Sequence, residues 1–202
     1  MAPSIAIIAA STRKVRVGKN VAETVQKIIQ DNGELSGTNL AFIDLADFNL
    51  PVFDEETIPA NVPERGQFVH EHSKKWSAAI GEHDGYIFVS PEYNYGTPGG
   101  VKNAIDYLMN EWKGKPLAVV TYGMQGGTFA SDQLKHSLSM MGLNVVETRP
   151  QLPFHGGLGP DAFAAIGEGK LGDATKKDWE TDHKDSIIKA FDEVKVLLAA
   201  KA

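Results

Sequence analysis

Short apolar segments alternate with amphipathic segments along the whole chain, and this alternation limits the possible folds more than any other feature. About five apolar runs are typical of buried strands: Ile5–Ala10, Asn39–Leu45, Gly85–Ser90, Pro116–Tyr122 and Val145–Leu152. After each run, apolar residues recur at helical spacing: in Val17–Gln30, Gln67–Ile80, Gly99–Met109, Thr128–Met141 and Asp185–Ala200. Such a series predicts a parallel sheet with helices on both faces.

The number of strands narrows the topology further. About five parallel strands suit the flavodoxin-like order 2-1-3-4-5, because right-handed crossovers leave few other arrangements. We therefore expect an α/β fold, a three-layer sandwich in which residues 1–202 form a single domain. Residues 155–184 are rich in glycine and are expected to be irregular, either a flap near the site or a solvent-exposed loop. Residues 185–202 are expected to form a C-terminal helix.

The composition excludes several functional classes. The chain has no cysteine, which rules out disulfides, thiolate metal sites, iron–sulfur clusters and cysteine nucleophiles. A formal net charge of −6 argues against a broad nucleic-acid interface. No stretch approaches the ~18 apolar residues of a membrane span, and the first apolar run lacks the basic flank of a secretion signal. We therefore expect a cytoplasmic protein with neither nucleic-acid nor membrane partners.

The loop after the first strand combines hydroxyls, arginines and a glycine in Ser11–Asn20. A helix N-terminus attracts anions at such a position, and Arg13 or Arg16 would add charge-assisted hydrogen bonds to a phosphate. A solvated basic turn capped by Ser11 is the alternative. The loop matches neither the Walker A nor the Rossmann glycine pattern, so Asp44 is interpreted as an ordinary strand-end residue.

The loops after the third and fourth strands should reach the same edge of the sheet. Ser90–Asp106 reads SPEYNYGTPGGVKNAID, and its prolines and glycines predict a tightly turned loop that can present backbone groups to a planar ligand. Gly123–Gly127, GMQGG, opens the next helix. Close approach of a ligand and an undemanding turn both explain these glycines.

The segment Ser90–Leu108, SPEYNYGTPGGVKNAIDYL, resembles the signature of the NADPH-dependent FMN reductase family, flavodoxin-like reductases of quinones, flavins and azo dyes. Three further segments agree with it: Ala10–Lys19, Asp44–Glu56 and Glu111–Gly127. The resemblance covers roughly Ile5–Leu152 in order, and its central motif is long enough to be specific.

The resemblance implies that FMN lies across the three loops. Its phosphate would be held by Ser11, Arg13, Arg16, Val17 and Gly18. The isoalloxazine ring would be lined, mostly through backbone contacts, by Pro91, Glu92, Tyr93, Asn94 and Tyr95. The other side of the site would be closed by Tyr122, Gly123 and Gly126.

The resemblance also implies an activity. NADPH or NADH would pass hydride to bound FMN, and a quinone or similar acceptor (free flavin, azo dyes) would then take it in a ping-pong sequence, with no catalytic side chain. A homodimer with the flavin near the interface is implied; Trp112 and the helix Gly99–Met109 belong either to that interface or to the core. A flavodoxin-type electron carrier and a flavin-dependent interaction protein without significant NAD(P)H turnover are the alternatives.

The histidines and paired carboxylates give little sign of a second site. His70 and His72 are two residues apart on a predicted helix and are expected to point to different faces. No ligand spacing of a known metal site occurs, so no metal is expected. Glu55 and Glu56 are interpreted as a solvated loop.

Overall fold

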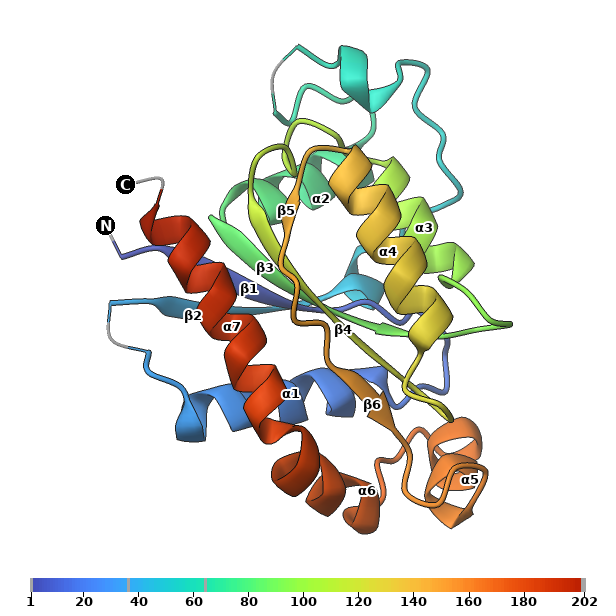
Figure 1. The fold of residues 1–202 in the computed structure, drawn as a ribbon. Coiled ribbons are helices and arrows are strands. Elements are labelled where there is room, and N and C mark those ends of the chain that lie inside the picture. The colour runs from blue at the N-terminus through green and yellow to red at the C-terminus, as the bar shows by residue number, and fades with distance from the viewer. Residues whose placement is uncertain (1, 36, 64, 201–202) are drawn as a thin grey trace.

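A parallel sheet runs through the middle of the molecule, with its strands in the order β2-β1-β3-β4-β5. The computed structural model describes residues 2–35, 37–63 and 65–200 (Figure 1). The strands are β1 (Ser4–Ala9), β2 (Asn39–Asp44), β3 (Gly85–Pro91), β4 (Pro116–Gly123), β5 (Asn144–Val145) and β6 (Gln151–Pro153). All pairs are parallel, and β6 also pairs with β4. The predicted α/β class and strand order are confirmed.

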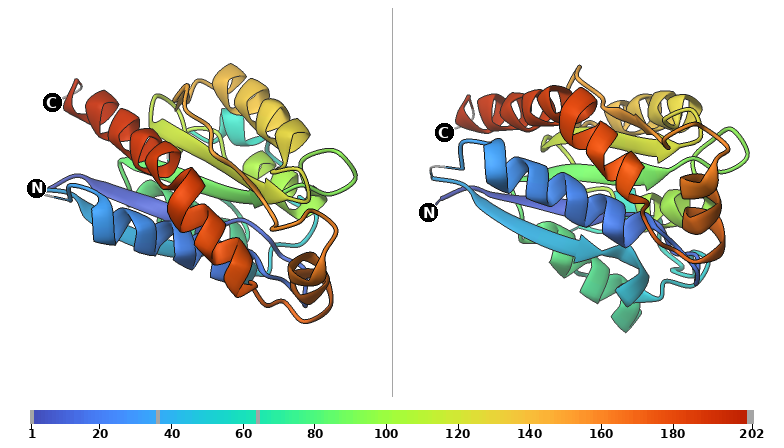
Figure 2. Two further views of the ribbon diagram at one scale, coloured as in Figure 1. Left: turned by 60° about the horizontal axis from the view of Figure 1, so that its bottom comes forward. Right: turned by 90° about the horizontal axis from the view of Figure 1, so that it is seen from below.

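The central strands are mostly apolar, and successive side chains point to opposite faces of the sheet, so both faces are apolar. In β1, Ile5 and Ile7 join one buried cluster, whereas Ala6 and Ile8 join the other. The first cluster packs under α1 (Gly18–Asn32) and α7 (Lys184–Ala199). The second packs under α2 (Glu71–Gly81), α3 (Gly99–Asp106) and α4 (Thr128–Met140). Figure 2 shows these layers from two further sides.

The predicted fifth strand, Val145–Leu152, is wrong as one continuous element. It is divided into β5 and β6, which pair with opposite ends of β4. Between them, Thr148 is held by a side chain instead of a neighbouring strand: its N–H and hydroxyl donate to the two carboxylate oxygens of Glu193 at 2.9 and 2.6 Å. Pro150, which has no N–H, follows shortly after and cannot donate to a ladder.

The expectation that residues 155–184 are irregular is also wrong. They contain α5 (Pro160–Gly167), α6 (Asp173–Asp178) and a π-helical turn, Trp179–His183, and α7 begins at Lys184. The Asp161 carboxylate accepts from both the N–H and the hydroxyl of Thr175, so it ties the two short helices together. The glycines therefore separate short helices instead of forming one long loop.

The interior also decides where Trp112 belongs. It is fully buried, and its ring meets those of Trp76 and Tyr86 at centroid distances of 6.2 and 5.1 Å. Trp112 is therefore part of the intramolecular core, the second of the two predicted placements. Within the described ranges, no helix combines the length and the apolar character needed to cross a membrane.

Candidate functional site

Three loops meet at the carboxyl edge of the sheet, and we call them together the three-loop edge: residues 10–17 after β1, 92–98 after β3 and 124–127 after β4. They converge because β1, β3 and β4 are parallel neighbours. The Glu92 N–H donates to the Tyr122 carbonyl at 3.1 Å, which joins the second loop to β4. Gly100 lies so close to Thr12 that a Cβ there would collide with the threonine hydroxyl.

One nitrogen of the Arg16 guanidinium, at the start of α1, lacks a hydrogen-bond partner among the described residues. Its Nη2 donates to Asp44 at 2.7 Å, whereas its Nη1 is buried and has no hydrogen-bond partner among the described residues. Helix α1 begins beside it without a side-chain cap, and the first N–H groups of any helix lack intrahelical partners. A buried cationic donor next to free helix N–H groups suits an anion such as a phosphate.

The hydroxyls of Ser11 and Tyr122 lie beside Gly18, at the start of α1. Both residues are buried, and among the described residues the Ser11 hydroxyl has no hydrogen bond of good geometry, although the Tyr122 hydroxyl lies nearby. A Cβ at Gly18 would collide with both hydroxyls, so only glycine fits there. Burial raises the pKa of Tyr122, whose ring packs against Phe154 at 6.5 Å. The Tyr122 side chain is thus part of the core.

Arg13 connects three segments. Its Nε donates to the Val15 carbonyl at 2.6 Å and its Nη2 to the Ile166 carbonyl at 3.3 Å. The guanidinium also lies 5.8 Å from the ring centroid of Tyr93. Burial raises the pKa of Tyr93, against the opposing effect of Arg13 and Arg16, so its hydroxyl keeps its proton. Arg13 is therefore already bonded to the loop and to α5.

The loop after β3 forms a two-residue turn. Tyr93 and Gly96 exchange both backbone hydrogen bonds at 3.1 Å, and Asn94 and Tyr95 between them have φ of 49° and 59°. Two successive left-handed residues define a primed hairpin turn, which favours asparagine and glycine. Asn94 and Tyr95 are exposed, and Pro91 is buried at the end of β3.

The loop after β4 is closed by its own backbone. The Gly123 carbonyl accepts from the N–H groups of Gly126 and Phe154, and the Thr121 hydroxyl donates to the Gly126 carbonyl at 2.8 Å. Gly126 has φ of 78°, and a Cβ there would lie 2.9 Å from that of Gln151. This position needs glycine for both reasons.

The sequence interpretation missed several contacts that shape the edge. Asp44 is the ion-pair partner of Arg16, and its place beside β1 at a strand end was the available signal. Glu92 also acts through its side chain, which accepts from the Ala130 N–H at 3.1 Å. Gly169, with φ of 68°, packs so closely on Arg16 that a Cβ would lie 2.9 Å from its carbonyl oxygen. No local pattern identified Gly169.

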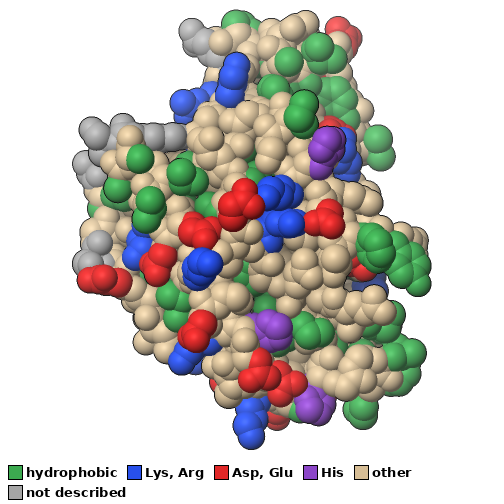
Figure 3. Space-filling view, viewed as in Figure 1, with side chains coloured by type: hydrophobic (Ala, Val, Ile, Leu, Met, Phe, Trp, Pro, Cys, Tyr) green, Lys and Arg blue, Asp and Glu red, His purple; other side chains and the backbone are tan. Residues whose placement is uncertain are grey.

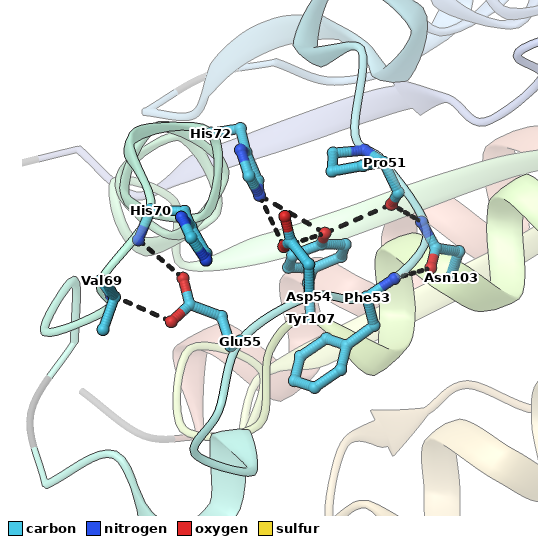
Figure 4. A network of polar contacts seen from close by, with 9 residues as sticks. All are labelled: Pro51, Phe53, Asp54, Glu55, Val69, His70, His72, Asn103 and Tyr107. Atoms are coloured by element: carbon cyan, nitrogen blue, oxygen red, sulfur yellow. Dashed lines mark hydrogen bonds and ion pairs between the residues drawn. The ribbon is translucent and has the colours of Figure 1, made fainter.

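The histidines and Glu55 form a separate polar network near the start of α2 (Figure 4). His70 precedes α2, and its ring stacks on that of His72 at 5.2 Å, so the expectation of different faces is wrong. His72 Nε2 lies 2.8 Å from Asp54 Oδ1, which also accepts from the Tyr107 hydroxyl at 2.9 Å.

Glu55 is buried, not solvated as expected. Its two carboxylate oxygens accept from the N–H groups of Val69 and His70 at 3.0 and 2.9 Å. Burial disfavours the charged form, but the Ser73 hydroxyl and these backbone N–H groups hold the pKa of Glu55 below its ordinary value. In the part of the chain that the structure describes, no group of three or more histidine, aspartate or glutamate side chains is placed to hold a metal ion.

Comparison with known proteins agrees with the geometry of the edge. The family model described as NADPH-dependent FMN reductase matches residues 3–155. The chain belongs to this family. The predicted oxidoreductase class, and FMN with a nicotinamide co-substrate, are confirmed at the level of the family.

Several relatives carry related names. An NAD(P)H-dependent FMN reductase of Nectria sp. is 49% identical over 196 residues, covering 96% of each chain. A protein of the same description from Saccharomyces cerevisiae is 37% identical, covering 70% of this chain and 76% of its own length. A quinone reductase of Pseudomonas putida is 32% identical, with 86% and 87% covered.

Solved structures agree on the fold. The flavoenzyme NAD(P)H:acceptor oxidoreductase FerB of Paracoccus denitrificans superimposes with a TM-score of 0.64 at 24% identity, covering 95% of this chain and 98% of its own. An archaeal flavodoxin has a TM-score of 0.52 at 13% identity, with 96% and 99% covered. At these identities the likeness shows a flavodoxin-like fold and no more.

Proposed function

We propose that the chain is an FMN-dependent NAD(P)H oxidoreductase that delivers hydride from NADPH, or from NADH, to quinones or similar acceptors such as free flavin and azo dyes. Relatives named as NAD(P)H-dependent FMN reductases and as a quinone reductase support this activity. FMN held by the three-loop edge would supply the hydride-transfer chemistry, and a ping-pong order of the two substrates is part of the proposal. The observation that carries the proposal is the unpartnered, buried Nη1 of Arg16 at the start of α1.

The phosphate of FMN fits the loop after β1. Arg16 would donate Nη1 to it, and Val17 and Gly18 would present backbone N–H groups at the helix start. The Ser11 hydroxyl, buried and without a well-aligned partner, would turn toward the same anion. Arg13 would contribute charge while it stays bonded to the carbonyls of Val15 and Ile166.

The isoalloxazine ring fits beside the other two loops. Pro91, Glu92, Tyr93, Asn94 and Tyr95 would line it, and Tyr122, Gly123 and Gly126 would close the other side, mainly with backbone groups. The half-exposed Tyr93 keeps its proton because burial raises its pKa, so it would offer a neutral hydroxyl and a ring face. These side chains would bind and orient the cofactor, exclude water and supply no nucleophile or general base.

The proposal includes a homodimer with the flavin near the interface, and a cytoplasmic location as predicted from the sequence. Large apolar side chains are exposed along the three-loop edge, at the start of α4 and on α5: Tyr95, Met124, Phe129, Phe163 and Ile166. In Figure 3, hydrophobic side chains gather on the side of the molecule where α5 lies. A second copy covering part of this side would remove that surface from water.

The test is the visible spectrum of the FMN-loaded protein during anaerobic titration with NADPH. We expect stoichiometric bleaching of the flavin that is reversed when a quinone is added. A bound flavin that stays yellow would contradict the reductase activity and favour an electron carrier or an interaction protein. Failure of the apoprotein to bind FMN would contradict the assignment of the three loops. A parallel titration with NADH shows which nicotinamide is preferred.

A further inference from the structure

The turn after β3 holds a tyrosine in a backbone conformation that tyrosine does not favour. Asn94 and Tyr95 both have left-handed backbones, with φ of 49° and 59°. For a residue as large as tyrosine this conformation is costly, and it persists only where the surroundings fix it. Such residues occur often at ligand sites. The contacts that fix this turn therefore identify side chains that control the site without touching the ligand.

Helix α4 supplies one of these contacts through Gln133. The side-chain oxygen of Gln133 accepts from the Thr97 N–H at 2.9 Å, immediately after the turn. The same amide group lies flat against Gly96: a Cβ there would be 2.8 Å from Gln133 Oε1 and 3.0 Å from its Nε2. Gly96 thus allows an approach that any larger residue would prevent, and Gln133 uses it.

Two further contacts connect the same loop to the same helix. The Tyr95 ring meets the Phe129 ring edge-on at a centroid distance of 5.8 Å. Glu92, on the other side of the turn, accepts from the Ala130 N–H at 3.1 Å. Phe129 and Gln133 are one helical turn apart, so they project from the same face of α4 toward the loop. The first two turns of α4 therefore clamp the loop at both ends.

We propose that Gln133 is a positioning residue for the flavin site. Through Thr97 and Gly96 it holds the Asn94–Tyr95 turn in its left-handed conformation, and so sets the affinity of the loop for FMN and the balance between oxidised and reduced flavin. This inference rests on the proposed function, because it assumes that the loop lines the isoalloxazine ring. Backbone dipoles fixed beside that ring interact differently with its two redox states, which is how a turn can tune a cofactor.

The first test uses the apoprotein and needs no activity. Hydrogen exchange of the Thr97 amide is compared in the unaltered protein, Gln133→Ala, Gln133→Leu and Gln133→Glu. We expect faster exchange in the alanine and leucine variants, which lack the acceptor, and protection restored in the glutamate variant. Gln30→Ala is the matched control, because Gln30 is an exposed glutamine near the C-terminal end of α1, whereas the loop after β1 leads into its N-terminal end. Its Thr97 exchange should equal that of the unaltered protein.

The second test measures the flavin itself. Loss of one hydrogen bond to the loop should weaken FMN binding about five- to tenfold in Gln133→Ala and Gln133→Leu, measured by quenching of flavin fluorescence. The reduction potential of bound FMN should shift in both variants, and Gln30→Ala should change neither quantity. A merely structural residue would lower the melting temperature of the apoprotein and leave the potential unchanged.

The close approach at Gly96 gives a third, independent test. Gly96→Ala should push the Gln133 side chain away and reproduce the loss seen in Gln133→Ala. In the Gln133→Ala background the added methyl group has space, so the double variant should bind FMN no more weakly than either single one. Additive losses would contradict the coupling between the two residues.

The outcomes separate two failures. If the unaltered apoprotein does not bind FMN, the proposed function fails and this inference fails with it. If it binds FMN, the inference is overturned when Gln133→Ala keeps the affinity and potential of the unaltered protein, whether or not Thr97 exchange changes.

Discussion

The three-loop edge and the β2–α2 connection (residues 45–63 and 65–70) are both loop regions at the same sheet. They differ in whether their polar groups have hydrogen-bond partners within the protein. In the connection, polar groups find partners within the protein: Asn103 accepts from Phe53 N–H at 2.9 Å and donates to the Pro51 carbonyl at 2.7 Å, and Asp54 and Glu55 accept hydrogen bonds as described above. At the three-loop edge, Arg16 Nη1 is buried without a hydrogen-bond partner among the described residues.

This difference distinguishes polar groups that stabilise the fold from polar groups that are available to bind a ligand. A buried polar group without a partner costs free energy, so it is kept where a ligand completes it. The network of Figure 4 has histidines, carboxylates and a tyrosine, the residue types of an active site, but Asp54, Glu55, His72 and Tyr107 are already hydrogen-bonded within the protein. Among the described residues, buried side-chain atoms without a hydrogen bond of good geometry also occur elsewhere, at Ser73 Oγ, Trp112 Nε1 and Arg149 Nε. The three-loop edge is distinguished because its unpartnered cationic nitrogen, Arg16 Nη1, lies beside a helix start without a side-chain cap.

The largest expected effect comes from the three-loop edge. Arg16→Ala should weaken FMN binding roughly 10- to 100-fold, because charge-assisted hydrogen bonds to the phosphate are lost. The measurement is fluorescence titration of the apoprotein with FMN. Lys14→Ala is the matched control, since it removes the same charge from an exposed position of the same loop. Equal losses in both variants would mean that overall charge, not the buried guanidinium, governs binding.

A smaller and different effect is expected in the β2–α2 connection. Tyr107→Phe removes a hydroxyl that donates to Asp54 at 2.9 Å and lies 3.2 Å from the Pro51 carbonyl. The free energy of unfolding should fall by about 1 kcal/mol, the net contribution of one hydrogen bond, and FMN affinity should stay unchanged. Chemical denaturation and FMN titration check the two halves. A loss of FMN affinity without a loss of stability would contradict the claim that this network stabilises the fold and takes no part in FMN binding.

The smallest expected effect is a pH dependence in the same network. Burial disfavours the charged form of Asp54, but the hydrogen bonds from His72 and Tyr107 outweigh it, so the pKa of Asp54 lies below its ordinary value. A depressed carboxyl pKa stabilises the fold at pH values above the unfolded pKa of about 3.9, and this contribution is lost as the pH falls through the folded pKa. Asp54→Asn should therefore destabilise the protein at pH 6 and much less at pH 3, measured by denaturation at both. An equal difference at both pH values would contradict the assignment.

The sequence was sufficient for the scaffold and for the location of the edge. Buried strands such as Gly85–Pro91 are continuous apolar runs, and their parallel order follows from the intervening helices. The motif around Tyr93 also identified the loop that forms the turn. The left-handed pair at Asn94 and Tyr95 was not predicted, because the three glycines of the motif offered more favourable positions.

Other features depend on contacts between distant segments. Gln133 and Gly169 approach the loops across many residues of sequence, and no local pattern marks such meetings. The position of His70 was mistaken because α2 begins at Glu71, and a residue before a helix does not follow helical spacing. Glu55 was mistaken because its partners are backbone N–H groups, which leave no trace in composition.

The most direct test of the central claim is hydrogen exchange of the backbone amides with and without FMN. We predict that FMN slows exchange in residues 11–20, 92–98 and 123–127, and leaves the β2–α2 connection unchanged. Protection of the connection around Asp54 and His72, with none at the three-loop edge, would contradict the account.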